Sequence, residues 1–398
     1  MNARTLLLAS ALFAAPAMGQ TPYTRAAAVE AALDRGARLG VARADTAVAN
    51  AALIGARAFP NPALSVTYSK DAPHYHEIAD IPLDFPWLRN LRVQSARLGL
   101  NAALLRYQFA RATIALDADT TYTKAIAARE RLALSRRNAL DADSLLHMVE
   151  RQRDAGDASD LDVELARVNA GQQANTAAAD SLDWMSALLD LQAVLGLTSE
   201  RLEISATDSL GEPPDVPTPG VATLNETAAD LSLQSATLAA RLQRRSLWAS
   251  PTISAGIEHG APDEPGLLPT VGIGIGLPLF DRNRGAIAEA DAERARAQAE
   301  LTLARVEARS DIAHATRERV NALVRVVRDR AVVASADRVA SMSLTAYREG
   351  ASSLPNVLEA QRNAREVLAQ YIDDLAAAWI ATAELRVLAL TPSTTSQP

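Results

Sequence analysis

The stretch from Tyr347 to Ala364, Tyr-Arg-Glu-Gly-Ala-Ser-Ser-Leu-Pro-Asn-Val-Leu-Glu-Ala-Gln-Arg-Asn-Ala, decides the fold because an earlier stretch repeats its pattern. The earlier copy begins Arg153-Asp154-Ala155-Gly156-Asp157-Ala158-Ser159 and continues to Ala170. One constant offset aligns Gly156 with Gly350, Ser159 with Ser353, Val163 with Val357, Ala166 with Ala360 and Asn169 with Asn363. A repeat spaced by about half the chain indicates two copies of one structural unit.

Each copy has the chemistry of a turn between two helices. The glycine is expected to end one helix in the left-handed conformation, and the serine three residues later to cap the next helix. An ordinary tight helix hairpin explains one copy equally well. Two matched copies favour a built-in pseudo-symmetry in which each half of the chain carries one hairpin tip.

Composition limits the class of protein. Residues 1–19 have the pattern of a secretory signal peptide, with Arg4 before an apolar run and small residues before the expected cleavage. The chain has no cysteine, so its stability must come from packing rather than from disulfides. The net charge of −7 argues against nucleic-acid binding, which requires a basic face.

The first half alternates between helical and extended patterns. An Ala-rich segment, residues 24–58, predicts one long helix that ends at Phe59-Pro60-Asn61-Pro62. Apolar residues then alternate with polar ones, which predicts strands at about 62–69 and 78–86. From about residue 91 to 153 an apolar repeat of 3.5 residues predicts a coiled-coil helix about 90 Å long, with a tip at 154–160.

The second half replays this order. After a helix at about 161–195, a proline-rich connector covers residues 198–222 and a further helix covers about 224–248. Strands are predicted at about 251–258 and 271–279, followed by a helix at about 286–347, a tip at 349–354 and a last helix. The first structural repeat is therefore residues 20–197, the second is 223–390, and 391–398 is expected to be a disordered tail.

Four strands of eight to ten residues have the length that crosses an outer membrane at a tilt. Four strands cannot close a barrel with an open lumen, so several chains must share one barrel. The alternative is a soluble β-hairpin cap on a helical stalk. In the barrel reading, the lipid-facing residues are Leu64, Val66, Tyr68, Ile253, Ile257 and Ile275, and the flanking aromatic belt is Phe59, Tyr68, Phe85, Trp87, Trp248 and Phe280.

The duplicated units and a few local motifs together resemble the TolC-like outer-membrane efflux protein family over nearly the whole mature chain. The most telling matches are Asn61-Pro62, the stretch Leu277-Pro278-Leu279-Phe280-Asp281-Arg282-Asn283-Arg284-Gly285, and the second tip with Val357-Leu358-Glu359-Ala360-Gln361-Arg362. The stretch 277–285 is most similar to the heavy-metal-exporter branch.

The resemblance implies a mainly α fold with a small β-barrel part. Three chains would form a homotrimer with a twelve-stranded barrel in the outer membrane of a Gram-negative bacterium and an α-helical tunnel in the periplasm. It also implies docking to a periplasmic adaptor (membrane fusion) protein that belongs to an inner-membrane pump. The implied function is passive exit for substrates of a tripartite efflux pump, such as metal ions or drugs.

The resemblance also assigns roles to residues at the tips. Glu359 and Asn356, which match the family's acidic entrance positions, would form the periplasmic gate, although Asn356 departs from the acidic pattern. Three copies of Glu359 around an axis would favour cations. The adaptor-docking residues would be Arg153, Gly156, Ser159, Arg348, Gly350 and Ser353.

No residue pattern predicts an enzyme, a cofactor or a resident metal ion. His74 and His76 fall in one predicted outer loop, and His-x-His without cysteines or a carboxylate cluster is more typical of a polar surface than of a metal site. The glycines at 272, 274 and 276 precede a strand end, so they do not predict a phosphate loop. A type I secretion duct and a coiled-coil stalk or adhesin remain alternatives to the efflux channel.

Overall fold

The computed structural model describes residues 20–35, 37–199, 201–216, 222–246, 251–263 and 266–391. The predicted signal peptide, Trp248 and nearly all of the predicted tail lie outside the described residues. The chain divides into two compact units. The tip unit comprises Met1–Arg35, Asp117–Gly211 and Val326–Ala376, and the sheet unit comprises Gly36–Leu116, Glu212–Arg325 and Ala377–Pro398. Each unit contains parts of both sequence repeats.

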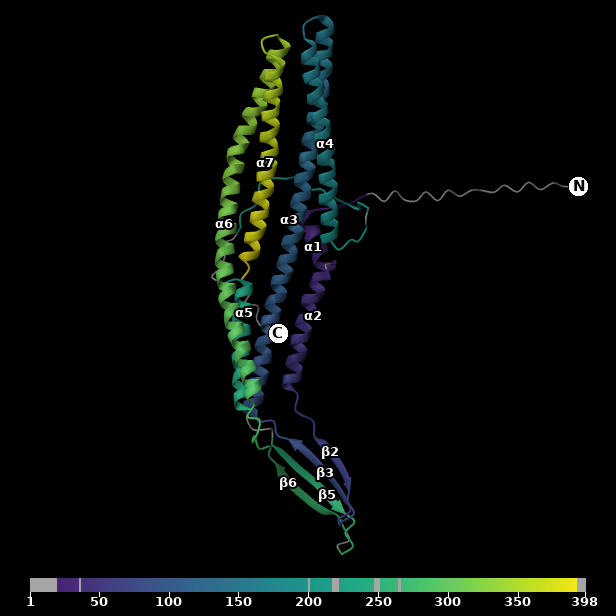
Figure 1. Ribbon diagram of the computed structural model, residues 1–398, viewed down its shortest axis with the longest axis vertical. Coiled ribbons are helices and arrows are strands. Elements are labelled where there is room, and N and C mark those ends of the chain that lie inside the picture. Colours follow the sequence, from purple (N-terminus) through teal and green to yellow (C-terminus); the bar gives the residue numbers. More distant parts are fainter. Residues whose placement is uncertain are drawn as a thin grey trace, which may run out of the picture. The chain divides into compact units, whose positions relative to one another are not determined.

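Helices make up most of the described chain (Figure 1). Their bounds are α1 (Arg25–Arg35), α2 (Ala37–Arg57), α3 (Pro86–Ala155), α4 (Asp160–Val194), α5 (Leu224–Arg245), α6 (Arg284–Arg348) and α7 (Leu354–Leu388). The region predicted as one helix, 24–58, contains two, α1 and α2. None of the described helices has an apolar stretch long enough to cross a membrane.

Within the tip unit, several positions of the predicted 3.5-residue repeat on α3 are buried, whereas Leu104, near the other end of the repeat, is exposed. Ala118, Ala125, Leu132, Ala142 and Val149 are all buried. Alanine at these positions allows close approach between helices, while leucine and valine supply apolar area. The coiled-coil pattern therefore identified the buried side of this helix within the tip unit.

Two short strands tie the start of the chain to the connector. Strand β1 (Thr21–Tyr23) pairs in parallel with β4 (Ile204–Ala206), which lies within the segment predicted as irregular. The fully buried Tyr122 of α3 donates its hydroxyl hydrogen to the carbonyl oxygen of Tyr23 at 2.8 Å, and burial raises the pKa of this phenol. The sequence did not predict β1 and β4, because a strand of three residues is too short to show an alternation of apolar and polar side chains.

The other four strands form an antiparallel sheet in the order β2, β3, β5, β6 (Figure 1). Their bounds are β2 (Ala63–Tyr68), β3 (Tyr75–Pro82), β5 (Thr252–His259) and β6 (Leu268–Gly274). Within the described chain, the outer edges of β2 and β6 have no partner strand. Both strand pairs were predicted, but β3 and β6 lie about three residues earlier than expected.

Pairing explains the shifts. Residues Tyr75 to Glu77 looked like loop, yet they pair with β2 on one side and with β5 on the other. Strand β6 ends at Gly274 because its only partner, β5, begins opposite at Thr252. Ile275 therefore lies beyond the strand. Pro269, which cannot donate a hydrogen bond, is tolerated because β6 is an edge strand.

The register gives the sheet one apolar and one polar face. Leu64, Val66, Tyr68, Val271 and Ile273 share the first face, and each side chain is more than 60 % exposed. The opposite face holds mostly small or polar residues, namely Ser65, Thr67, His76, Asp80, Thr252, Ser254, Gly256, Glu258, Thr270, Gly272 and Gly274, together with Ala63, Ile78, Pro82 and Leu268. This alternation agrees with the predicted apolar positions in β2 and β5.

The motif before α6 builds a turn. Asn283 has a positive φ of 57°, and its backbone N–H donates to the Asp281 carboxylate at 2.9 Å. Its side-chain amide donates to the carbonyl oxygen of Gln243 at 2.9 Å, near the end of α5. Asparagine suits this position because it tolerates the left-handed conformation better than most residues do.

Candidate functional site

The first tip reverses the chain between α3 and α4 as the glycine predicted. Gly156 has a φ of +86°. Its N–H donates to the carbonyl oxygen of Arg153 at 2.9 Å, and the next N–H, from Asp157, donates to Gln152 at 2.8 Å. This pair of bonds is a Schellman motif, which satisfies carbonyl groups left open at the end of a helix.

The second tip, between α6 and α7, has the same geometry. Gly350 has a φ of +73°, its N–H donates to Tyr347 at 3.0 Å, and the N–H of Ala351 donates to Ala346 at 2.8 Å. A Cβ added to Gly156 or to Gly350 would meet no atom within 4 Å. Glycine is therefore required at both positions by backbone conformation and not by lack of space.

The two tips differ in how the following helix begins. Ser159 caps α4 in a capping box: its hydroxyl accepts from the N–H of Asp162 at 3.1 Å, and the Asp162 carboxylate accepts from the Ser159 N–H at 3.1 Å. Ser353 immediately precedes α7 and is exposed. Asn356 occupies the position that matches Asp162, so it stands where a capping-box residue would stand.

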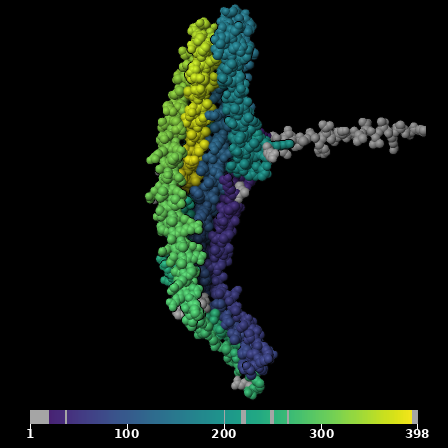
Figure 2. Space-filling model, in the orientation of Figure 1, coloured from purple at the N-terminus to yellow at the C-terminus, as the bar shows by residue number. Residues whose placement is uncertain are grey.

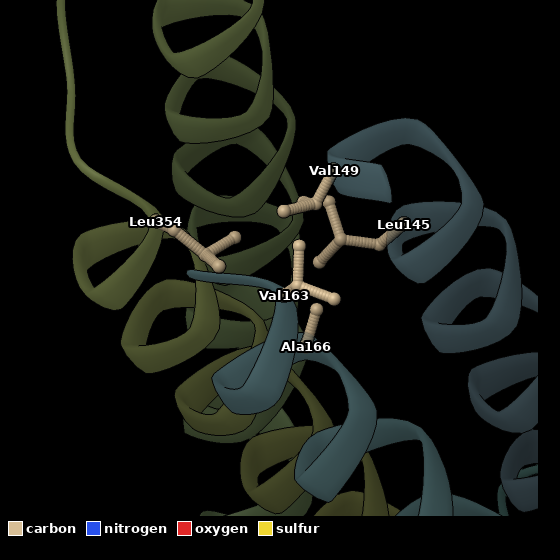
Figure 3. Close-up of a cluster of buried hydrophobic side chains, with 5 residues drawn as sticks. All are labelled: Leu145, Val149, Val163, Ala166 and Leu354. Atoms are coloured by element: carbon tan, nitrogen blue, oxygen red, sulfur yellow. The ribbon is translucent and has the colours of Figure 1, made fainter. Parts of the chain in front are cut away.

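An apolar cluster, here called the tip cluster, joins the two hairpins. It consists of Leu145, Val149, Val163, Ala166 and Leu354, all at most 2 % exposed. Figure 3 shows that the side chain of Leu354, at the start of α7, points toward the side chains from α3 and α4. Figure 2 shows the two tips in contact. The tip residues predicted from both repeats therefore belong to one packed end of the tip unit.

Tyr347 extends this contact between hairpins. It packs against the tip cluster, and burial together with the nearby Asp162 carboxylate raises the pKa of its phenol. Asp162 thus both caps α4 and faces the end of α6. The repeat alone does not reveal this contact, because it joins residues that are distant in the sequence.

The two predicted docking arginines are exposed but differ in their surroundings. The Arg153 guanidinium lies 2.6 Å from the Asp154 carboxylate and 4.0 Å from that of Asp160, which raise the pKa of Arg153. Arg348 is one of the residues that line a cavity of about 330 Å³ between α3, α6 and α7. The cavity lining also includes the charged residues Asp141, Asp337 and Arg365.

Arg365 is half-buried beside this cavity, and burial lowers the pKa of its guanidinium. The nearby Asp141 and Glu366 carboxylates act in the opposite direction. Apolar side chains such as Leu145, Met148 and Leu344 line the rest of the cavity. The groove therefore offers both apolar area and charges of both signs close to the tips.

The predicted gate residues occupy the solvent side of α7. Val357 is fully buried and Leu358 packs on the tip cluster, while Asn356 and Glu359 are both exposed. The Glu359 side chain is 56 % exposed and accepts from the Arg362 guanidinium at 2.9 Å. Arg362 also lies 3.7 Å from Glu366. Sequence reasoning missed Arg362, although a cation three residues after a helical glutamate is a recognisable signal.

Three histidines lie in or beside the sheet. His76 lies in β3 rather than in the predicted loop, and His74 lies just before that strand, with its Nδ1 3.1 Å from the Ser69 carbonyl oxygen. His259 is the last residue of β5. Among the described residues, no three histidine, aspartate or glutamate side chains are arranged to hold a metal ion.

Comparisons with known proteins rest on structure alone. No family model matches the sequence, and no curated protein matches it. Among solved structures, CusC, described for its transmembrane channel formation, is 17 % identical with a TM-score of 0.77, over 92 % of this chain and 91 % of its own. The outer membrane channel CmeC of Campylobacter jejuni is 16 % identical with a TM-score of 0.78, over 92 % and 85 %.

A third similar structure is the outer membrane protein VceC of Vibrio cholerae. It is 18 % identical, with a TM-score of 0.75 over 92 % of this chain and 96 % of its own. Identities this low establish the fold and not the activity. The chain therefore has the TolC-like channel fold, mainly helical with a small antiparallel sheet, as the sequence resemblance implied.

Proposed function

We propose that the chain is the outer-membrane exit channel of a tripartite efflux pump and works as a homotrimer that conducts substrate passively. The observation that carries this proposal is the four-stranded sheet, which exposes an apolar face while the outer edges of β2 and β6 have no partner strand in the described chain. Such a sheet is unstable alone in water or in lipid. Pairing β2 of one copy with β6 of the next removes both edges.

The helices of the tip unit support the same assembly. Leu161, Val168, Leu182 and Leu189 are exposed and lie seven or fourteen residues apart along α4, with Asn175 at the intervening position of the series. Val327, Val339 and Met342 are exposed on α6. Apolar stripes of this kind are typical of helices that pack against another chain. We infer that α4 of one copy packs against α6 of the next.

Head-to-tail contacts of this type close into a ring when the rotation between copies allows it. Three copies would give twelve strands, the number that the TolC-like resemblance implies. Expression of the full chain and fractionation of the cells tests the proposal. We expect a heat-modifiable trimer in detergent-extracted outer membranes and channel activity in planar bilayers. A soluble, monomeric rod would overturn it in favour of a stalk.

The two tips are proposed to dock to the periplasmic adaptor through Arg153, Gly156, Ser159, Arg348, Gly350 and Ser353. Because a Cβ at Gly350 would meet no atom within 4 Å, we expect a large residue there to change the outer surface. We expect Gly350→Trp to abolish efflux while trimer and export remain. Gly350→Ala is the matched control, since it has the same backbone strain without the bulk, and it should retain most activity. Full resistance with Gly350→Trp would exclude docking at this tip.

The gate is proposed to be formed by Glu359, with Asn356 one turn before it. The ion pair with Arg362 reduces the negative field that Glu359 can supply. We therefore expect Glu359→Ala to raise single-channel conductance and lower cation selectivity, and Arg362→Gln to raise cation selectivity. If both variants behave as the wild type in bilayers, the gate lies elsewhere.

The transported substrate is proposed to be a drug or a metal ion, exported by the partner pump. The stretch 277–285, which resembles the heavy-metal branch, builds the turn into α6 through Asn283. A deletion strain tested against metal salts and drugs, with the chain restored on a plasmid, identifies the substrate class. Loss of protein secretion instead would favour a type I secretion duct.

A further inference from the structure

Three exposed aromatic side chains lie where the helices meet the sheet. Phe59 follows α2, Trp87 is in the first turn of α3, and Phe280 precedes α6. These residues are 68 %, 55 % and 100 % exposed. Figure 1 shows these helix ends beside the four-stranded sheet, and all three residues belong to the sheet unit. Exposed aromatic residues at one level of a molecule mark an interaction surface.

The aromatic residues border the apolar face of the sheet at both ends. Leu277 and Leu279, beyond the end of β6, are exposed and lead to Phe280. At the hairpin end, Tyr68 and Tyr75 lie opposite each other on β2 and β3, with ring centroids 5.3 Å apart. Between these two levels β3 has eight residues, a length of about 26 Å. This is close to the height of the apolar band that outer-membrane proteins expose to lipid.

Four arginines accompany the aromatic residues at the helix ends. Arg57 is the last residue of α2, Arg245 is the last residue of α5, and Arg282 and Arg284 stand at the start of α6. All four are exposed. Within the part of the chain that the structure describes, none of their guanidinium groups has a hydrogen bond or an ion pair. These four residues, here called the arginine collar, therefore present positive charges that the described fold does not use.

Two other arginines at this level hold the fold together. The Arg89 guanidinium lies over the Phe59 ring, 4.5 Å from its centroid, and donates to the carbonyl oxygen of Arg57 at 2.9 Å. Arg92 donates to the buried Asp84 carboxylate at 2.8 Å. A cation over a ring attracts its face, so Arg89 fixes the position of Phe59. The collar differs from these arginines because its guanidinium groups remain available.

The two ends of the sheet carry opposite charge. The segments at the helix ends, namely 57–62, 83–92, 243–246 and 275–285, contain seven arginines and two aspartates. The segments at the hairpin loops, 69–77 and 258–268, contain one lysine and five acidic residues. Only the helix end of the sheet is therefore suited to a partner with negative charge.

We propose that the arginine collar binds the phosphate groups of anionic phospholipids in the leaflet nearest the helices, while Phe59, Trp87 and Phe280 enter the head-group region. This inference rests on the proposed trimeric channel, in which the apolar face of the sheet contacts lipid. Guanidinium groups bind phosphate oxygens through two parallel hydrogen bonds. Aromatic side chains are enriched at the same depth in outer-membrane proteins.

The arrangement favours a lipid surface over a single soluble phosphate compound. The collar is spread over three exposed helix ends rather than gathered in one cavity. In the proposed ring, β2 of one copy meets β6 of the next, so Arg57 of each copy and Arg282 of its neighbour belong to one continuous surface. Unpaired cations favour lipids with a net negative charge, because a zwitterionic lipid carries an ammonium group that cancels its phosphate.

Native mass spectrometry of the purified full-length protein in detergent tests the collar. Phosphatidylglycerol and phosphatidylcholine with identical acyl chains are added in equal amounts. The trimer should retain the first about fivefold over the second, the factor that one arginine at a membrane surface supplies. Arg282→Gln with Arg284→Gln should lower this ratio by at least about twofold. Arg136→Gln with Arg137→Gln, exposed on α3 in the tip unit, is the matched control and should keep it.

Phe280→Ala separates the apolar part of the surface from the charged part. The ring carries no charge, so its removal should reduce the retention of both lipids alike and leave their ratio unchanged. If the ratio instead falls as far as in the Arg282 and Arg284 variant, selectivity comes from packing and the role of the collar is wrong.

The remaining outcomes separate the collar from the channel itself. If the parent protein forms no trimer, the proposed function fails. If the trimer forms but retains both lipids equally, the collar is wrong. An equal loss of selectivity in the Arg136 and Arg137 variant would also overturn it. Should the double collar variant fail to assemble, Arg57→Gln is the second test, and it should lower the ratio in the same direction.

Discussion

At the scale of single residues, Gly350 is required for its backbone conformation. An alanine there would be forced into the left-handed region at a cost of about 1–2 kcal/mol, although its Cβ meets no other atom. Gly350→Ala should therefore speed hydrogen exchange at the N–H groups of Gly350 and Ala351 by about fivefold to thirtyfold. Gly171 lies inside α4, and a Cβ there would also meet no atom within 4 Å. Alanine is more favourable than glycine inside a helix, so Gly171→Ala should slow hydrogen exchange at the neighbouring N–H groups of α4. Equal effects of the two changes would contradict this account.

Glu384 provides a prediction about pH at the same scale. Burial raises the pKa of this carboxyl above its ordinary value of 4.5, Glu318 raises it further, and His314 opposes them. The folded state therefore loses stability as pH rises through the raised pKa, because the carboxylate must form in a half-buried place. Glu384→Gln should raise the melting temperature at pH 7 but give no advantage at pH 4. Glu307→Gln, exposed on α6, is the control and should change little.

The sequence repeat predicted the residues that form the turn and the helix cap at each tip, but not the residues that connect the two hairpins to each other. Gly156, Gly350 and Ser159 act locally, so their roles follow from turn and capping chemistry. The Asp162 carboxylate raises the pKa of the Tyr347 phenol across two hairpins, and the His76–Glu258 pair joins strands far apart in the sequence. Such contacts depend on tertiary packing and register, which local patterns do not specify.

At the scale of elements, alternation predicted that strands exist, while pairing set where they begin and end. The apolar face of the sheet was predicted at Leu64, Val66 and Tyr68 because a strand alternates with a period of two. The start of β3 was missed because Tyr75, His76 and Glu77 are a polar sequence that becomes a strand only between two partners. Buried positions on α3 were predictable since a 3.5-residue period is local information.

The stripe on α4 gives a prediction at this scale. Leu182 is 65 % exposed and belongs to the stripe, whereas Leu140 on α3 is 70 % exposed and lies outside it. A charge placed between packed helices costs several kcal/mol unless it is paired. Leu182→Glu should therefore lower the temperature at which the trimer dissociates on a gel, and Leu140→Glu should not. If the two variants dissociate at the same temperature, α4 is not part of the interface between chains.

At the scale of the whole molecule, the assembly is predicted to be head-to-tail, with the α4 stripe of each chain against α6 of the next. Counted from the tips, Val168 and Leu182 on α4 stand level with Val339 and Val327 on α6. A ring built this way needs two different faces on every chain. A two-fold arrangement would instead join like faces, α4 with α4 or α6 with α6.

Mixed expression distinguishes the two arrangements. One chain carries Val168→Glu with Leu182→Glu, and the other carries Val327→Glu with Val339→Glu. In a head-to-tail ring every interface joins α4 of one copy to α6 of the next. When either variant is expressed alone, every interface therefore contains one substituted helix, and trimers should be lost. Co-expressed, the intact α6 of the first chain can still meet the intact α4 of the second, which should give one-to-one dimers that cannot close. Cross-linking in detergent followed by mass measurement detects these dimers. If each variant alone forms a stable homodimer, like faces pair and the ring is wrong.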